Sequence, residues 1–386
     1  MHDVIVLGLG ATGSAALYQL AKRGMRALGL DRHAPPHGHG SSHGESRITR
    51  QAIGEGAHYT PLVLRSHEIW RAMEAETDRS LLTVTGGLIV SSPEATSHTH
   101  VAGFFDNTCA AARAHGIGHE ILDAAAIRAR FPQFRVGHGE RGYFEPGAGY
   151  LHAEACVSAN LELAKRHGAT IATEETVLSF ARDGRAIAVR TDKGTRRCDR
   201  LVVAAGPWLP SLLDGSLSRL FRVMRQLLFW FAPDGDVTPF LPARFPVFIW
   251  EVRGRPTPIY GIPAIGGEEG GVKIGTEQLT RDTSPDCVER TVGADEIHAM
   301  HADYVAPFVL GLSPRAVRAE TCLYTVTPDA GFVVDTLPGE ERVIVASPCS
   351  GHGFKHSAAL GEAIAERLGE GTSRIDLAPF GFARFR

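Results

Sequence analysis

The stretch DVIVLGLGATGSAALYQLAKRGMRALGLD, residues 3–31, decides how the chain begins to fold. The uninterrupted apolar run at residues 4–7 is typical of a strand buried on both faces. Residues 14–23 then show the apolar spacing of an amphipathic helix, and residues 27–30 form a second short apolar run. The stretch therefore predicts a strand, a helix and a second strand, which is the first unit of a parallel α/β sheet.

Three glycines between the first strand and the helix have the G-x-G-x-x-G spacing of a dinucleotide-binding loop. Gly8 allows a tight turn, Gly10 lets backbone N–H groups approach a pyrophosphate, and Gly13 lets the helix sit close to the strand. Asp31 ends the second strand, where its carboxylate can accept hydrogen bonds from both hydroxyls of an adenosine ribose. The sequence therefore predicts a dinucleotide site, although this motif alone does not choose between FAD and NAD(P).

The composition is that of an ordinary globular protein of 386 residues, enough for about two domains. The formal net charge of −3 gives no case for a nucleic-acid or anionic membrane surface. Six widely spaced cysteines without a C-x-x-C pair argue against a zinc site and a disulfide framework. Because the first strand begins by Val4 and no apolar run approaches the ~20 residues of a membrane helix, we expect a cytoplasmic protein.

A loop rich in Gly, Pro and His follows Asp31 and contains His33, His37, His39 and His43. No Cys, Asp or Glu is interleaved among these histidines, so we expect a turn-rich loop and no metal site.

The rest of the chain alternates between helical and extended patterns. Helices are predicted at 59–76, 94–116, 124–131, 154–167 and 357–368, with a mainly helical stretch at 285–309. The pattern predicts an antiparallel meander of short strands at 170–172, 177–181, 186–191 and 196–198. Further strands are predicted at 83–90, 201–205, 315–325 and 343–347, and residues 222–280 are rich in strand-like segments.

The last strand, at 343–347, runs into a glycine turn and then a helix, as the first strand does. A second helix N-terminus therefore points toward the carboxyl ends of the strands. Two such termini favour a cofactor longer than one phosphate-binding loop can hold, which favours FAD over NAD.

Three distant blocks resemble the family of monomeric sarcosine oxidase and N-methyltryptophan oxidase, FAD-dependent amine oxidases of the D-amino-acid-oxidase superfamily. The blocks are GSSHGESRITRQAIGEGAHYTPLVLRSHEIW (40–70), CLYTVTPDAGFVVDTLP (322–338) and SGHGFKHS (350–357). The resemblance implies an α/β fold: a Rossmann-like FAD domain of the p-hydroxybenzoate-hydroxylase type, and an interleaved α+β substrate domain with a large mixed sheet. We expect the FAD-binding domain at 1–82, 150–215 and 320–386, and the substrate domain at 83–149 and 216–319.

The same resemblance implies a monomer that oxidises a secondary amine, such as an N-methyl or cyclic amino acid. The C–N bond becomes an imine, O2 is reduced to H2O2, and water hydrolyses the imine. The partners would be the small amino acid and O2. Cys322 matches the family cysteine that bonds covalently to the flavin 8α carbon; the alternative from the residues alone is an inert buried thiol.

The glycine motifs and the resemblance together give the expected FAD-binding residues. They are Gly8, Gly10, Gly13, Asp31, Arg32, Ser41, Ser42, Arg47, Val177, Gly206, Cys322, Gly351, Gly353, Phe354 and Lys355. Family matching places Arg47 against the flavin ring, and Arg50 and Lys355 at the substrate carboxylate. The alternative for each is a solvated surface charge.

Lys273 lies between two apolar residues of a predicted strand and therefore takes the opposite face from both. It matches the family lysine that sits over the flavin and activates O2, where a cation favours electron transfer. The alternative is a lysine that faces outward. Tyr260 and Tyr324 match aromatic residues of the family's substrate cavity, with ordinary packing as the alternative.

Three positions depart from the family pattern. Ser42 replaces a second histidine, the loop 266–271 is about two residues longer, and Glu277 stands where the family has an active-site histidine. Glu277 can pair with Lys273, point into the cavity or turn to solvent. In the cavity it would favour substrates with an extra amino, hydroxyl or amide group.

Two other functional classes keep the flavin. One is a dehydrogenase that passes electrons to a quinone or protein acceptor, and the other is an FAD-holding binding or sensor protein without turnover. An NAD dehydrogenase is a more distant alternative.

Overall fold

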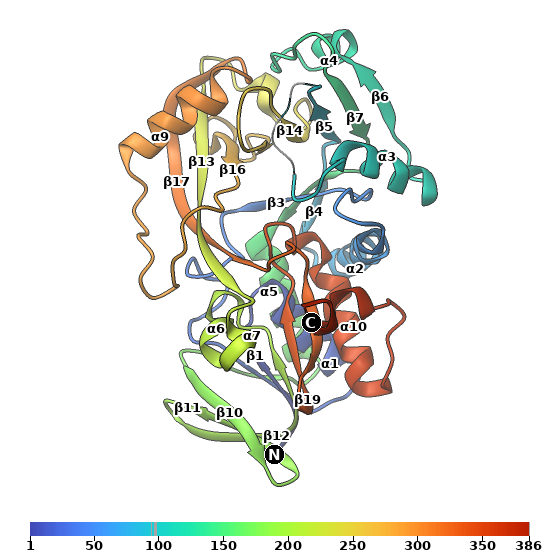
Figure 1. Cartoon of the computed structure of the whole chain (residues 1–386), viewed down its shortest axis with the longest axis vertical. Coiled ribbons are helices and arrows are strands. Elements are labelled where there is room, and N and C mark those ends of the chain that lie inside the picture. The colour runs from blue at the N-terminus through green and yellow to red at the C-terminus, as the bar shows by residue number, and fades with distance from the viewer. Residues whose placement is uncertain (94, 96–98, 386) are drawn as a thin grey trace.

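The computed structural model describes residues 1–93, 95 and 99–385, and within them the chain forms two eight-stranded sheets and a three-stranded one. In the view of Figure 1 one large sheet lies below and the other above. The lower sheet contains β1 (His2–Leu7), β2 (Ala27–Leu30), β9 (Thr170–Ala172), β10 (Val177–Asp183), β11 (Ala186–Thr191), β12 (Gly194–Val203), β18 (Val333–Leu337) and β19 (Glu340–Ser347).

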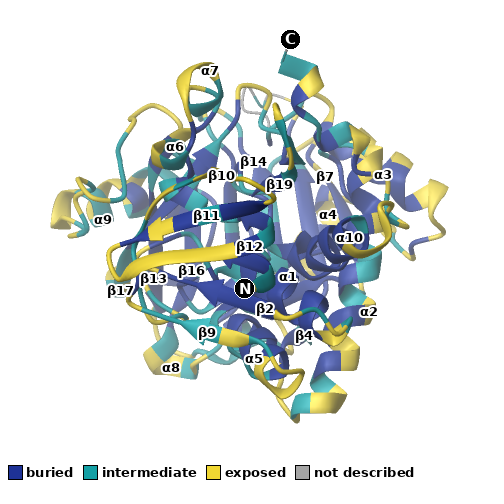
Figure 2. Cartoon of the chain, turned by 90° about the horizontal axis from the view of Figure 1, so that it is seen from below, coloured by how far each residue is buried: buried dark blue, intermediate teal, exposed yellow. Residues whose placement is uncertain are grey.

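The centre of the lower sheet is parallel, in the order β9, β2, β1, β12 and β19. Alternate residues of β1 face opposite sides: Val4 and Val6 pack against the helices, and Ile5 and Leu7 pack toward the meander side. The helices on the first side include α1 (Ala11–Lys22), α5 (Ala153–Arg166) and α10 (Ser357–Glu370). Val4–Leu7 of β1 and all of β2 are buried, and Figure 2 shows β2 in the colour of buried residues.

The upper sheet has the order β17, β13, β16, β15, β14, β5, β7 and β6, and it is mixed because β14 and β5 pair in parallel. Its strands are β5 (Gly87–Ser91), β6 (Glu120–Asp123), β7 (Arg141–Glu145), β13 (Arg222–Pro233), β14 (Val247–Glu251), β15 (Ile259–Ile262), β16 (Val272–Thr276) and β17 (Leu312–Val326). A small sheet of β3 (Ser46–Thr49), β8 (Gly149–His152) and β4 (Leu82–Val84) joins the two regions.

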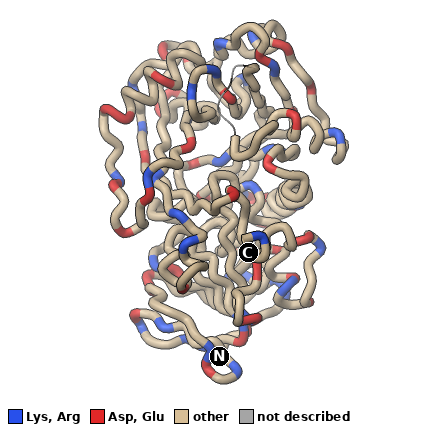
Figure 3. The backbone as a smooth tube through the Cα atoms, viewed as in Figure 1, with Lys and Arg blue, Asp and Glu red and all other residues tan. Residues whose placement is uncertain are grey.

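The remaining helices are mostly short. They are α2 (Thr60–Thr77), α3 (Phe104–Ala114), α4 (Ala124–Arg130), α6 (Leu209–Leu212), α7 (Gly215–Ser218), α8 (Gly267–Gly270) and α9 (Ala294–Met300). None of the helices in the described residues is long and apolar enough to cross a membrane. Acidic and basic side chains are interspersed along the whole chain (Figure 3).

Two strand predictions were wrong in detail. β9 does not belong to the antiparallel meander, because it pairs in parallel with β2 and the meander begins at Val177. The segments at 196–198 and 201–205 form one strand, β12, which ends at Val203. The first part of β12 pairs antiparallel with β11, and its last part pairs in parallel with β19. β1 pairs in parallel with β12 from Cys198 onward, so hydrogen-bonded pairing continues through the polar residues between the two predicted segments.

Two helix predictions also need correction. Part of the predicted helix at 94–116, namely residues 94 and 96–98, lies outside the described residues, and α3 starts only at Phe104. Gly103 precedes it with a φ of 71°, a left-handed conformation that cannot continue a helix. In the stretch 285–309, only α9 and a following π-helical turn, His301–Val305, are helical.

The division of the chain into two interleaved domains stays a prediction. The strands of the upper sheet fall at 87–145 and 222–326, so that β17 crosses the boundary expected at residue 320.

Candidate functional site

A cavity of about 460 Å³ is lined at one end by the glycine turn after β1 and at the other by residues of the upper-sheet strands β13, β14, β15, β16 and β17. This volume is within the range of small-molecule and cofactor sites. The cavity is lined by all of the expected FAD-binding residues except Gly13, and by all six residues expected to act on the substrate or O2: Lys273, Arg50, Lys355, Tyr260, Tyr324 and Glu277.

The glycine turn leaves no room for side chains. Gly8 has a φ of 81°, and a Cβ on it would lie 2.5 Å from the Ala204 carbonyl oxygen. Gly13 lies behind the cavity, inside α1, where a Cβ would come within 1.8 Å of the Gly8 oxygen. The helix therefore packs against the turn only because both residues are glycine, and its N-terminal N–H groups are kept close to the cavity.

Polar side chains fix the same turn. Asp31 accepts hydrogen bonds from the backbone N–H groups of Leu9 (2.7 Å) and His33 (2.8 Å), and Ser42 Oγ accepts one from Ala11 (3.0 Å). Arg32 pairs with Asp286 at 2.8 Å, which brings a loop after β16 to this end of the cavity. The glycine turn and the helix N-terminus suit a pyrophosphate, and Asp31 at the end of β2 suits a ribose, so the three features together fit a dinucleotide.

The histidine-rich loop packs through its rings. His33 stacks on His39 with ring centroids 4.1 Å apart, and His33 and His37 both contact Trp208. Among the described residues, no group of three His, Cys, Asp or Glu side chains is arranged to hold a metal ion.

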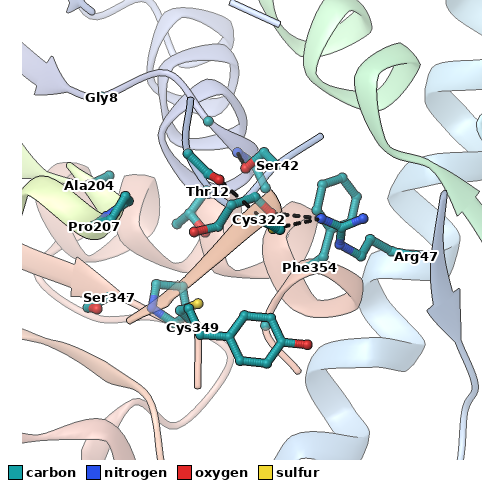
Figure 4. A pocket seen from close by; sticks show the side chains of 18 of the residues that line it. Gly8, Thr12, Ser42, Arg47, Ala204, Pro207, Cys322, Ser347, Cys349 and Phe354 are labelled. Carbon is teal, nitrogen blue, oxygen red and sulfur yellow. Dashed lines mark hydrogen bonds between the residues drawn. The ribbon is translucent and has the colours of Figure 1, made fainter. Parts of the chain in front are cut away.

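Cys322 is buried, and Arg47 Nη2 donates to its Sγ at 3.7 Å (Figure 4). Burial alone would raise the pKa of the thiol, but the neighbouring His43 and the Arg47 charge lower that pKa to about 7. An electropositive environment of this kind favours a thiolate over the inert thiol that was the alternative.

Nδ1 of His43 in turn lies 3.4 Å from Oε2 of Glu320. Burial opposes its charged form, but the nearby Cys322 and Glu320 raise the pKa of His43 to about 9. Analysis of the sequence missed Glu320, and it treated His43 as one of several incidental histidines. The available signal was the spacing of Glu320 and Cys322, because residues two apart in a strand share a face.

Lys273 is 1% exposed, and its Nζ donates to the backbone oxygens of Gly44 (2.7 Å) and Ser46 (2.9 Å). The predicted alternation along β16 therefore holds, with Lys273 directed to the cavity side rather than outward. Burial, followed by repulsion from Arg47, lowers the pKa of Lys273 well below its usual value. Its positive charge is thus more easily lost at raised pH than that of an exposed lysine.

Arg50 is engaged by a residue that the sequence analysis missed. Its Nη2 lies 2.6 Å from Glu55 Oε2, its Nη1 donates to the Ala52 oxygen at 2.5 Å, and both side chains are buried. Burial would raise the pKa of Glu55, but Arg50 and then Lys355 hold it well below its usual value. The charge of Arg50 is therefore already balanced by Glu55, which competes electrostatically with a substrate carboxylate.

Lys355 donates to the His352 oxygen at 2.8 Å, and its Nζ lies 3.8 Å from Glu55 Oε1. Burial lowers the pKa of Lys355 to about 8, against the opposing effect of Glu55. Arg50, Glu55 and Lys355 thus form one buried cluster with an excess of positive charge, which suits an anionic group.

Tyr260, Tyr324 and Glu277 line the same cavity as this cluster. Burial raises the pKa of both tyrosines, so their hydroxyls stay protonated as donors. Glu277 does not turn to solvent, since its side chain is 11% exposed and its Oε1 lies 2.7 Å from Nε2 of His100. Of the three possibilities for Glu277, the structure shows a side chain at the cavity wall that pairs with His100 and not with Lys273. His100 was not among the residues expected at the site.

Residues 3–367 match the family model described as FAD dependent oxidoreductase. The chain belongs to this family. It is 39% identical over 375 residues, 96% of this chain and 94% of the relative, to monomeric sarcosine oxidase from Streptomyces avermitilis. It is 31% identical over 393 residues, all of this chain and 99% of the relative, to N-methyl-L-tryptophan oxidase from Salmonella arizonae.

Among solved structures, the chain resembles NikD, described as an unusual amino acid oxidase essential for nikkomycin biosynthesis. The TM-score is 0.83 at 24% identity, covering 98% of this chain and 97% of that one. This likeness shows the fold, and it confirms the predicted α/β architecture with large mixed sheets. The family model likewise confirms that the cofactor of this oxidoreductase is FAD.

Proposed function

We propose that this FAD-dependent oxidoreductase oxidises a secondary amine, an N-methyl or cyclic amino acid, to an imine and passes the electrons to O2. The observation that carries the proposal is one continuous cavity that joins the dinucleotide cradle to the buried cluster of Arg50, Glu55 and Lys355. A substrate carboxylate held at this cluster would place its amine in the same cavity as the cofactor. The printed names of the curated relatives support the reaction class.

In this proposal Arg50 and Lys355 bind the substrate carboxylate. The carboxylate shares Arg50 with Glu55, because the guanidinium donates from Nη2 to Glu55 and from Nη1 to Ala52 but has further N–H groups. A charge-assisted hydrogen bond contributes about 1.5–3 kcal/mol, and repulsion by Glu55 opposes this gain at Arg50, so Lys355 supplies an additional contact. Tyr260 and Tyr324 would border the remainder of the substrate.

FAD supplies the redox chemistry, and the protein supplies position and charge. Two electrons and two protons leave the C–H and N–H of the amine, O2 accepts them to give H2O2, and water hydrolyses the imine to an aldehyde and an amine. Lys273, when protonated, favours electron transfer to O2 because the first product is an anion. Arg47 and the helix N-termini would hold the ring and the phosphates.

We also propose that the flavin is covalently attached through Cys322. The support is the lowered pKa of the thiol and its contact with Arg47, with His43 and Glu320 placed to stabilise the thiolate. A thiolate is the nucleophile that a bond to the flavin 8α carbon would need; a C–H bond of the 8α methyl group would be lost in exchange, and O2 would accept the two electrons released. A monomeric state and a cytoplasmic location stay predictions.

Oxygen uptake with a panel of secondary amino acids tests this function. An oxidase consumes O2 and releases H2O2 with at least one member of the panel. A dehydrogenase bleaches with substrate but is reoxidised only by a quinone or protein acceptor, and a binding protein shows neither response. Either of the last two results would contradict the proposal.

A further inference from the structure

His100 and Glu277 are brought together from separate parts of the fold. His100 lies in the loop between β5 and α3, and Glu277 directly follows β16. The side chains are 7% and 11% exposed, and both line the cavity. An acid and a base that are both buried at the wall of a ligand cavity cost desolvation energy, so a pair of this kind points to recognition rather than to stability.

The pair has hydrogen-bonding capacity that the described residues leave unused. Nε2 of His100 approaches Glu277 Oε1 to 2.7 Å without hydrogen-bond alignment, and Nδ1 has no hydrogen-bond partner within the described part of the chain. Nδ1 lies 4.0 Å from Glu55 Oε1. Buried polar atoms of a native protein are normally satisfied, and in a cavity a ligand can do this.

The pair adjoins the proposed carboxylate site. A Cβ added to Gly351 would lie 2.7 Å from Glu277 Oε1 and 3.1 Å from His100 Nε2, so the backbone of Gly351 lies directly against both groups. Glu55 Oε1 is within 4.0 Å of both Lys355 Nζ and His100 Nδ1. A ligand whose carboxylate reaches Lys355 therefore lies beside His100 and Glu277.

We propose that His100 and Glu277 form a recognition pair for a neutral carboxamide on the side chain of the amino-acid substrate, an inference that rests on the proposed function. A carboxamide donates its NH2 to the carboxylate and accepts from the imidazole with its oxygen. A charged group would leave an unbalanced charge beside a pair that is already balanced. An apolar group of the same shape would bury both partners without new hydrogen bonds.

Three isosteric substrates test this preference: N-methylasparagine, N-methylleucine and N-methylaspartate, with sarcosine as reference. Sites built to hydrogen-bond a substrate group reject analogues without it strongly, so we expect kcat/KM for the carboxamide to exceed that for the isobutyl analogue by about 10²-fold or more. In His100→Leu/Glu277→Leu, which removes both charges together, this ratio should fall at least about tenfold.

Glu140→Gln is the matched control. Glu140 is a buried carboxylate paired with Arg253 at 3.0 Å in the upper-sheet region, and it does not line the cavity. Its substitution removes a buried negative charge of the same kind, and the substrate ratio should not change. A shift in this control equal to that in the double variant would show that any buried charge has the effect, and would overturn the proposal.

A binding measurement separates this inference from the proposed function. Succinamate and 4-methylpentanoate are isosteric acids whose dissociation constants can be read from the flavin absorbance without turnover. If sarcosine is oxidised but the double variant changes neither the ratio of kcat/KM values nor the ratio of dissociation constants, the recognition role is refuted and the oxidase function is supported. If no secondary amine is oxidised but wild type, unlike the double variant, binds succinamate more tightly than 4-methylpentanoate, the proposed oxidase function is refuted and the recognition role of the pair is supported. Equal binding of both acids by wild type, or preference for N-methylaspartate, overturns the inference.

Discussion

Replacing Glu55 by Gln should weaken the fold and strengthen the binding of carboxylates. Glu55 lies 2.6 Å from Arg50 and 3.8 Å from Lys355, and all three groups are buried. Without its carboxylate, two buried cations lose their counter-charge, which costs about 3–5 kcal/mol of unfolding free energy by analogy with other broken buried pairs. A bound carboxylate then replaces the missing charge and no longer competes for Arg50.

The gain in affinity follows from one freed charge-assisted hydrogen bond. Its net value of about 1.5–3 kcal/mol corresponds to roughly ten- to hundredfold tighter binding of a simple carboxylate such as 4-methylpentanoate. Thermal unfolding with and without this acid, together with titration of the flavin absorbance, measures both effects. Tight binding by Glu55→Gln should also restore much of its lost thermal stability, because a ligand of the folded state stabilises it by mass action.

Glu140→Gln again serves as a control, since its Arg253 partner lies outside the cavity. This variant should lose stability that carboxylates do not restore. If Glu55→Gln binds carboxylates more weakly than wild type, Glu55 does not compete with the ligand, and the reasoning about Arg50 is wrong.

Three further predictions concern single groups of the cavity. Acid-precipitated wild-type protein should stay yellow and Cys322→Ser should release its flavin, whereas loss of colour from denatured wild type would exclude the covalent bond. Covalent incorporation of FAD into the apoprotein should accelerate as the pH rises through about 7, because the Cys322 thiolate forms there. Lys273→Met should slow flavin reoxidation by O2 about 10²-fold or more but reduction by substrate much less, and stopped-flow traces with equal losses in both half-reactions would refute this role. Carboxylate binding should weaken above pH about 8, because Lys355 loses its proton there. The Lys355→Met variant should not show this pH dependence, and a wild-type pH profile in the variant would show that another group titrates.

The glycine cradle was predictable because its rules are local. Gly8 needs its positive φ, Gly13 needs its missing Cβ, and both requirements follow from a spacing that can be read in the sequence. Strand alternation placed Lys273 on the opposite face from Val272 and Ile274, but only the resemblance chose the cavity side for that face. The strand pairing of β9 could not be predicted, because a run of three residues specifies neither its neighbour nor its direction.

The partners in the cavity were harder to predict than the residues expected to act there. Arg50 and Glu277 stood out through the resemblance. Glu55 follows Arg50 by five residues in the same loop, whereas His100 reaches Glu277 only when two distant loops meet at the cavity. The role of Arg50 therefore changed from a free cation to one already engaged by a carboxylate. Sequence spacing contains no information on such pairing between distant segments, since it depends on how the upper sheet and its loops sit on the cofactor cradle.

The central claim is that this cavity couples oxidation of a secondary amine to reduction of O2. Anaerobic titration of the purified yellow protein with a reactive N-methyl or cyclic amino acid tests it most directly. We predict that one equivalent of the amino acid bleaches the flavin absorbance, and that O2 alone then restores it with release of one equivalent of H2O2. Failure of every secondary amino acid to bleach the flavin, or recovery of the absorbance only with a quinone or protein acceptor, would contradict the account.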